Sequence, residues 1–305
     1  MKKVAVVVGS GGQDGQLLTK HLLAHSYQVV GIGSKDIDIF DRNAVDKFLT
    51  SIRPDEIYYL AAYHHSSESV PQSDDILLQE SMKVHYDGIL NFLEVSSLKL
   101  PKVKIFYASS SHIYGGSESL QNESTPYEAS SVYAQTKIAG MKACHDYREQ
   151  KGLHVSVGIL YNHESPLRSP KFVSRKISSA VAKIKLQQEG SLELGDLDVT
   201  IDWGYAGDYV EAFWKILQLP YSDDFVVSTG VAKTLREFVE IAFSSQGFDY
   251  RKYVTLKNDI VKRQALRRVG DYSKLHKATG WKPATQFEEL IKMMVQNDIE
   301  LLSAK

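Results

Sequence analysis

Tyr133 and Lys137 stand four residues apart in a stretch whose pattern is typical of a helix. Residues at this spacing share one helix face, and a positive charge close to a phenol favours the phenolate. We therefore expect Lys137 to lower the pKa of Tyr133 toward neutrality, so that Tyr133 serves as an acid and base at a sugar hydroxyl. The spacing alone usually marks a surface pair, and its interpretation depends on the motifs that accompany it.

Three glycines at every third position, Gly9, Gly12 and Gly15, separate an apolar stretch at 4–8 from an amphipathic stretch at 16–23. This order indicates a strand, a turn and a helix. Missing side chains there let the backbone approach a pyrophosphate at the helix N-terminus. The spacing differs from the G-x-G-x-x-G form and is weak evidence alone, but its position after the first strand favours a dinucleotide site.

The residues at the end of the expected second strand indicate which dinucleotide binds. Gly33-Ser34-Lys35 contains no acid to accept the ribose hydroxyls of NAD in the usual way. Ser34 and Lys35 are instead suited to a 2′-phosphate. We therefore expect NADP as the cofactor, with NAD as the alternative, while the competing interpretation of Lys35 is a solvated lysine in a surface loop.

Strand-like and helical stretches alternate along the first half of the chain, which predicts an α/β fold with a doubly wound parallel sheet. From residue 163 onward the order is less regular, and we expect a smaller C-terminal substrate lobe at 163–305, packed against a cofactor-binding domain at 1–162. The expected strands are 4–8, 28–32, 56–60, 104–107 and 156–160, and the expected helices are 81–98, 132–150, 171–188, 210–217, 235–245 and 287–302.

Composition limits the classes of partner. The 36 basic and 37 acidic residues leave a net charge of −1, so we expect small-molecule partners rather than nucleic acid or a membrane surface. Cys144 is the sole cysteine, which excludes an internal disulfide and a thiolate metal cage, and no metal site is expected. The apolar run at 4–8 is too short for a secretory or membrane-spanning segment, so we expect a cytoplasmic protein.

Several stretches together resemble known proteins. The sequence is similar to the extended short-chain dehydrogenase/reductase superfamily at Leu60-Ala61-Ala62, at 108–115 and at Tyr133-x-x-x-Lys137. Within that superfamily it resembles the GDP-mannose 4,6-dehydratase family at Gly12-Gln13-Asp14-Gly15, 158–166, 172–177 and 202–210. The resemblance runs over nearly the whole chain and implies a Rossmann-type fold and a GDP-linked nucleotide-sugar substrate.

The resemblance also implies roles for individual residues. Asn162 is expected near the substrate diphosphate and Lys176 at the phosphates or the base, while Ser110 matches the family threonine that holds the sugar hydroxyl. Lys137 is expected to position the nicotinamide ribose as well as to tune Tyr133. The motifs place cofactor contacts at Gly9, Gly12, Gln13, Asp14, Gly15, Leu60, Ala61 and Ala62, with Asp38 and Ile39 at the adenine.

His112 stands where the family carries the glutamate that handles the C5 proton and the leaving hydroxyl. A neutral imidazole can abstract a proton and an imidazolium can donate one, so His112 is a candidate acid and base for the elimination of water. Its competing role is packing. The sequence therefore favours a 4,6-dehydratase, and leaves open an oxidoreductase acting at C4, or a non-catalytic NADP-binding protein.

Other departures from the family pattern bear on these alternatives. The loop after the second strand is shorter than the arginine-bearing loop that the family uses in tetramer contacts, which favours a homodimer. The stretches 266–271 and 279–283 look similar to the related GDP-4-keto-6-deoxysugar reductases, and Ile201 replaces an expected arginine. His65 and Arg267 are further candidates for substrate contacts.

Overall fold

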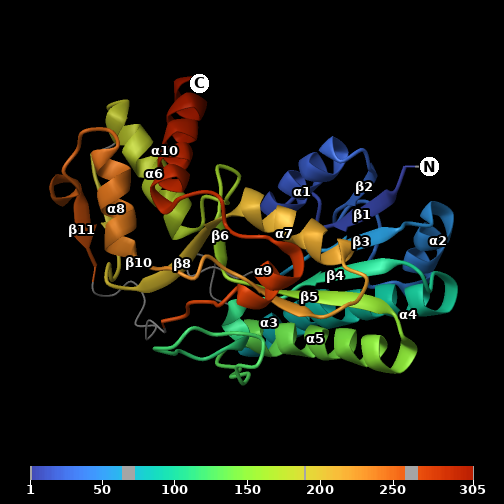
Figure 1. Ribbon diagram of the computed structural model, residues 1–305. Helices are drawn as coiled ribbons and strands as arrows, with labels where there is room; N and C mark the ends of the chain where they lie inside the picture. Colours follow the sequence, from blue (N-terminus) through green and yellow to red (C-terminus); the bar gives the residue numbers. More distant parts are fainter. Residues whose placement is uncertain (1, 64–72, 189, 258–266, 305) are drawn as a thin grey trace.

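Six parallel strands form the central sheet, in the order β2-β1-β3-β4-β5-β9 (Figure 1). The computed structural model describes residues 2–63, 73–188, 190–257 and 267–304. The predicted doubly wound fold and its first five strands are confirmed, whereas β9 was not anticipated. The strands are β1 Val4–Val8, β2 Gln28–Ile32, β3 Glu56–Tyr59, β4 Lys104–Ala108, β5 His154–Leu160 and β9 Asp224–Val227.

Helices cover both faces of this sheet, because strand side chains alternate between two apolar cores. Tyr58 and Phe106 point to the core beneath α1 and α7, while Tyr59 and Tyr107 point to the opposite core. Figure 1 shows α1 and α7 on one side of the sheet and α4 and α5 on the other. The covering helices are α1 Gln13–Ala24, α7 Ala206–Gln218 and α9 Ser273–Thr279 on the first face, and α2 Arg42–Ile52, α4 Ile89–Lys99 and α5 Val132–Lys151 on the second.

The helix expected at 81–98 is longer and less regular than its pattern suggested. It begins as α3 Asp74–Met82, continues as the π-helix η1 Lys83–Gly88 and ends as α4. Two buried phenols hold the π-helix, since the hydroxyl of Tyr59 donates to the carbonyl of Val84 and that of Tyr107 to the carbonyl of His85. Such π segments widen a helix locally and often accompany functional sites.

The remaining elements form a smaller lobe around a third apolar core. One sheet has the order β10-β8-β6 and another pairs β11 with β7, with three helices packed around them. No helix in the described ranges is long and apolar enough to cross a membrane. The elements are β6 Asn162–Glu164, α6 Val173–Lys185, β7 Leu192–Leu194, β8 Thr200–Tyr205, β10 Ala232–Thr234, α8 Leu235–Ser244, η3 Tyr250–Lys252, β11 Val254–Leu256 and α10 Phe287–Ser303.

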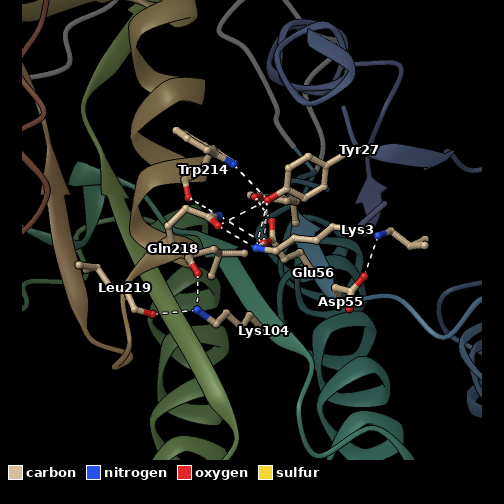
Figure 2. Close-up of polar contacts among 11 residues, drawn as sticks. Lys3, Tyr27, Asp55, Glu56, Lys104, Trp214, Gln218 and Leu219 are labelled. Atoms are coloured by element: carbon tan, nitrogen blue, oxygen red, sulfur yellow. Dashed lines mark hydrogen bonds and ion pairs between the residues drawn. The ribbon is translucent and has the colours of Figure 1, made fainter. Parts of the chain in front are cut away.

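A buried polar cluster closes the sheet at the amino ends of its strands. The carboxylate of Glu56, only 1% exposed, accepts hydrogen bonds from Lys3 at 2.9 Å, Tyr27 at 3.0 Å, Tyr58 at 2.7 Å and Gln218 at 3.2 Å. Figure 2 shows Lys3, Tyr27 and Gln218 converging on this carboxylate from three segments. The cluster joins the start of the sheet to α7, and its four donors compensate the buried charge.

Candidate active site

The carboxyl ends of β1 to β5 open into a cavity of about 1430 Å³. This edge is where open parallel sheets bind their ligands, since the crossover connections diverge there. Helix α5 supplies one wall: Ser131 caps its start by accepting a hydrogen bond from the backbone of Ala134, and Gly152 ends it at φ 65°. The cap places Tyr133 in the first turn, facing the cavity.

The glycine turn forms one end of the cavity. Gly9 has φ 87° and approaches the backbone of Ala61 so closely that a Cβ would lie 3.0 Å from its nitrogen. Gly12 caps α1, and a Cβ on Gly15 would collide with the carbonyl of Gly9. The three glycines therefore let α1 start directly against the cavity, where its N-terminal amides favour the binding of an anion.

The end of β2 lines the next part of the cavity, and it carries an acidic residue where the sequence suggested none. Gly33, Ser34 and Lys35 line it as expected, but Asp36 folds back and its carboxylate accepts a hydrogen bond of 2.7 Å from the backbone of Gly33. An acid therefore does stand at this strand end, immediately after the stretch Gly33-Ser34-Lys35. Further expected cofactor residues line the same region: Asp14, Asp38, Ile39, Leu60, Ala61 and Ala62.

Lys137 is almost fully buried, and its Nζ donates a hydrogen bond of 2.8 Å to the carbonyl of Ala108. Nζ also lies 5.7 Å from the centre of the Tyr133 ring. Burial lowers the pKa of Lys137 to about 7, because the ammonium has lost its hydration. At neutral pH the residue therefore exchanges readily between its charged and neutral forms.

Burial raises the pKa of Tyr133 to about 12, against opposing effects of the charge of Arg168 and a hydrogen bond with Ser110. The expectation that Lys137 lowers this pKa toward neutrality is therefore wrong for the structure described. The physical reason is that burial disfavours the phenolate, while the Lys137 ammonium is itself weakened and its hydrogen bond is directed to Ala108.

Ser110 and His112 lie beside Tyr133 on the short 3-10 helix η2 Ser111–Ile113 and its cap. The Ser110 hydroxyl accepts a hydrogen bond of 3.2 Å from the backbone of His112. The imidazole of His112 meets the Tyr133 ring edge to face, with 5.8 Å between centroids. The four residues predicted to be catalytic therefore line one region of the cavity.

A second histidine that the sequence did not reveal contacts Tyr133 from the π-helix. His85 is fully buried and meets the Tyr133 ring edge to face at 5.2 Å. Its Nε2 accepts a hydrogen bond of 3.0 Å from the backbone of Tyr63, and its Nδ1 lies 2.8 Å from the hydroxyl of Thr136. Because the backbone donor occupies Nε2, the hydrogen of the His85 ring is on Nδ1, and this neutral ring packs edge to face against Tyr133.

Arg168 is another cavity residue that sequence reasoning missed, although it lies only two residues after the recognised stretch 158–166. Its guanidinium lies 3.6 Å from the centre of the Phe172 ring and 3.1 Å from the carboxylate of Glu164. Its charge acts on Tyr133, Asp14 and His163. Arg168 is thus a cation held close to the reacting groups.

The predicted substrate residues have different outcomes. Asn162 lines the cavity, but neither Lys176 nor Arg267 is among its described lining residues. Arg267 donates a hydrogen bond of 3.0 Å to the carbonyl of Ser117. His65 lies outside the described residues. Their substrate contacts remain predictions.

An ion pair connects the glycine turn with β6. The carboxylate of Asp14 lies 2.9 Å from Nε2 of His163, whose ring stacks on Tyr209 with centroids 4.6 Å apart. Beside it, Gln13 donates to the carbonyl of His163 at 3.1 Å and accepts from the Ser165 hydroxyl at 2.8 Å. Across the described ranges, no three His, Cys, Asp or Glu side chains gather in a way that would hold a metal ion.

Sequence comparison gives one family over most of the chain. The profile described as GDP-mannose 4,6 dehydratase matches residues 34–294. GDP-mannose 4,6 dehydratase 2 of Arabidopsis thaliana is 36% identical, the alignment covering 98% of this chain and 88% of the relative. The human GDP-mannose 4,6 dehydratase is 32% identical, and the alignment covers 99% of this chain and 92% of the human protein.

Solved structures support the fold. RMD from Pseudomonas aeruginosa, complexed with NADPH, superposes with a TM-score of 0.86 over 99% of both chains at 21% identity. A second structure is that of DesIV, a dTDP-glucose 4,6-dehydratase from Streptomyces venezuelae with NAD and TYD bound. It superposes with a TM-score of 0.85 over 99% of this chain and 98% of DesIV, at 20% sequence identity. At these identities the similarity concerns the fold alone.

Proposed function

Because the chain belongs to the GDP-mannose 4,6-dehydratase family, we propose that it is an NADP-dependent lyase that removes water from GDP-mannose or a closely related GDP-sugar. The observation that carries the proposal is the meeting of Ser110, Tyr133 and Lys137 with the glycine turn in one cavity. Asn162 lies in the same cavity, where the substrate diphosphate is expected.

The cofactor assignment is supported by the fit of the cavity. The glycines at positions 9 and 12 leave the first amides of α1 open to a pyrophosphate. Lys35 lines the cavity after β2 and is a cation suited to a 2′-phosphate. The NADPH complex of the structural neighbour RMD agrees with this choice. Asp36 at the same strand end keeps NAD as the alternative.

NADP would supply the chemistry of accepting hydride from C4 of the sugar and returning it to C6. In our proposal Tyr133 takes the proton of the C4 hydroxyl, which Ser110 holds by a hydrogen bond. Tyr133 needs a pKa well below 12 for this step, and a protonated Lys137 beside it stabilises the phenolate.

The elimination step is assigned to His112. Once C4 is a ketone, the C5 hydrogen is acidic, and neutral His112 takes that proton as the C5–C6 double bond forms. The C6 hydroxyl then leaves with a proton from the resulting imidazolium, so water is lost and His112 returns to its neutral form. The hydride returned to C6 requires a proton at C5. In our proposal this is the proton that Tyr133 took from the C4 hydroxyl, passed on through His112, so that the phenolate is restored. The edge-to-face contact with Tyr133 supports this assignment, because it places the imidazole beside the residue acting at C4.

A second candidate function is an oxidoreductase at C4, either a GDP-4-keto-sugar reductase or a C4 oxidase. The observation that favours it is His112 itself, since the family glutamate is missing at this position. Without an acid and base for C5, the remaining residues still suffice for hydride exchange at C4.

The test is incubation of the purified protein with GDP-mannose and NADP, following product mass and nicotinamide absorbance together. Loss of one water without net NADPH is the expected result. Net NADPH without water loss would replace the lyase by a C4 oxidoreductase. No reaction with GDP-mannose, but turnover of a GDP-4-keto-sugar with NADPH, would establish the reductase instead.

We also propose a homodimer in the cytoplasm, with a cofactor domain at 1–162 and a substrate lobe mainly at 163–305. The dimer is supported by the short connection from Lys35 to Asp38, where the family carries a longer loop. The buried free thiol of Cys144 agrees with a reducing compartment. Light scattering of the eluted protein tests the dimer, and a tetramer mass would contradict it.

A further inference from the structure

We propose that Asp14 and His163 form a charge-neutralising pair that positions the glycine turn for the cofactor pyrophosphate and connects it with the substrate-side strand. The pair acts through the turn and not on the sugar, so both residues are positioning residues. This inference rests on the cofactor site proposed above.

The hydrogen bonds of His163 indicate that its ring is an imidazolium. Nδ1 lies 2.7 Å from the carbonyl of Tyr161 and Nε2 lies 2.9 Å from the carboxylate of Asp14. A carbonyl and an ionised carboxylate only accept hydrogen bonds, so both ring nitrogens carry a hydrogen. Burial opposes this charge, but Asp14 outweighs burial and raises the pKa of His163 above its ordinary 6.5.

Neutralisation matters because of where Asp14 stands. It lies in the first turn of α1, two residues after the cap at Gly12, and lines the cavity. The helix amides there favour an anion. An unpaired Asp14 carboxylate in the same turn would repel the pyrophosphate that those amides would bind. The imidazolium of His163 offsets that repulsion by pairing with the Asp14 carboxylate.

The groups around His163 come from three segments besides its own strand. Asp14 approaches from α1 and the Tyr209 ring stacks on the imidazole from α7. Arg168 comes from the segment after β6, and its charge lowers the pKa of both His163 and Asp14. The carboxylate of Asp14 is thus the anion that retains the proton on His163.

The same cluster joins the two sides of the cavity mechanically. Gln13 binds the carbonyl of His163 and the hydroxyl of Ser165, and that hydroxyl accepts a hydrogen bond of 3.1 Å from the backbone of Leu167. Asn162 directly precedes His163 on β6 and lines the cavity. A shift of the glycine turn therefore reaches the residue expected at the substrate diphosphate.

The test is the dissociation constant of NADPH, measured by fluorescence titration without sugar from about pH 6 to about pH 9. In the wild-type protein we expect a constant value at low pH and weaker binding as His163 loses its proton, by at most about tenfold for each pH unit. His163→Gln should weaken binding about tenfold at low pH and make the pH dependence shallower, while the part that comes from Lys137, with its pKa of about 7, remains.

A double variant distinguishes the electrostatic effect of the Asp14 carboxylate from a purely structural role of the Asp14–His163 pair. If Asp14 repels the pyrophosphate once His163 is gone, Asp14→Asn in the His163→Gln background should recover part of the affinity. A purely structural role predicts further loss. Asp14→Asn alone should flatten the pH profile, and it keeps the inference testable should the His163 variant not fold.

His145→Gln is the matched control, since His145 also pairs with an aspartate, Asp224, at 2.7 Å, and neither lines the cavity among its described residues. It should leave NADPH affinity and its pH profile unchanged. If the wild-type protein binds NADPH and His163→Gln leaves both the dissociation constant and its pH profile unchanged, this inference is overturned while the proposed function stands. Failure of the wild-type protein to bind either NADPH or NADP would instead overturn the proposed function.

Discussion

The Nζ atom of Lys137 lies 5.7 Å from the centre of the Tyr133 ring and gives its hydrogen bond to the carbonyl of Ala108 instead. The two residues share a helix face as their spacing predicts, and the ammonium lies over the phenol ring while its hydrogen bond goes to the backbone. Burial lowers the pKa of the lysine to about 7 and raises that of the tyrosine to about 12, so the structure favours the phenol over the phenolate at neutral pH.

Replacing Tyr133 by phenylalanine should reduce sugar oxidation at least about a hundredfold, because the proton acceptor is lost. The ring remains, including its contacts with His85 and His112, so folding and NADPH affinity should hardly change. Single-turnover formation of NADPH from GDP-mannose measures the effect. Tyr127→Phe, at a partly exposed ring, is the control, and an unchanged rate in Tyr133→Phe would remove the central claim.

Lys137→Met should stabilise the protein while abolishing its activity. Burial lowers the pKa of Lys137 from 10.5 to about 7, so the unfolded chain binds more protons and the native lysine costs stability. That cost is complete below pH 7 and disappears as the pH rises toward 10.5. The gain in the free energy of unfolding should be on the order of a few kcal/mol at about pH 7.

Urea unfolding at about pH 7 and at about pH 10 measures this gain and its decline. The control is Lys142→Met, which changes an exposed lysine on the same helix. An equal gain at both pH values would show that the buried charge is not the cause.

His112→Ala should stop the loss of water while C4 oxidation continues, because only the C5 proton transfer is lost. Mass spectrometry of the products distinguishes the 4-keto sugar from its dehydrated form. His112→Glu restores the carboxylate that the family carries and should retain dehydration. If the alanine variant still loses water at the wild-type rate, His112 is a packing residue.

Lys35→Ala should weaken NADP binding about tenfold and leave NAD binding unchanged, since only NADP carries the 2′-phosphate. Asp36→Asn should have the opposite effect on NADP, because the carboxylate on the backbone of Gly33 repels the same phosphate. Equilibrium titrations with both cofactors provide the comparison. Lys102→Ala, an exposed lysine outside the cavity lining, is the control, and equal losses for both cofactors would contradict the assignment.

Glu56→Gln should lower the free energy of unfolding by about 3 kcal/mol, because an amide would face the ammonium and phenol donors that now share one carboxylate. The cluster lies at the amino ends of the strands, opposite the cavity, so kcat should stay close to the wild-type value. Urea unfolding measures the change. The exposed pair of Glu193 with Lys257 supplies the control, and Glu193→Gln should cost less than about 1 kcal/mol.

Local patterns in the sequence predicted the fold well where they are strong. The apolar run Val4–Val8, the glycines after it and the amphipathic stretch behind them give β1, the turn and α1 as described. The π-helix could not be predicted from its own residues. Its geometry depends on the hydroxyls of Tyr59 and Tyr107, which donate hydrogen bonds to its backbone carbonyls from strands distant in the sequence. Strand β9 was missed because Asp224–Val227 is short and lies among helical segments.

The site was predictable in its residues and less so in its electrostatics. Motif positions placed Ser110, His112 and Tyr133 together, and the structure has them in one cavity. Burial, which depends on the whole fold, decides the charge states, and for Tyr133 it reversed the expected direction. Asp14 and His163 are 149 residues apart in the sequence, so a local sequence pattern could not predict that they pair.

The central sheet takes its last strand from a segment made late in the chain. Until Asp224–Val227 leaves the ribosome, the buried strand β5 has no partner along one edge. An unpaired apolar edge can pair with other chains, so synthesis passes through a stage in which this protein is exposed to aggregation. Slow translation or truncation before residue 224 would prolong that stage, and chaperone binding should fall once Asp224–Val227 has emerged and paired with β5.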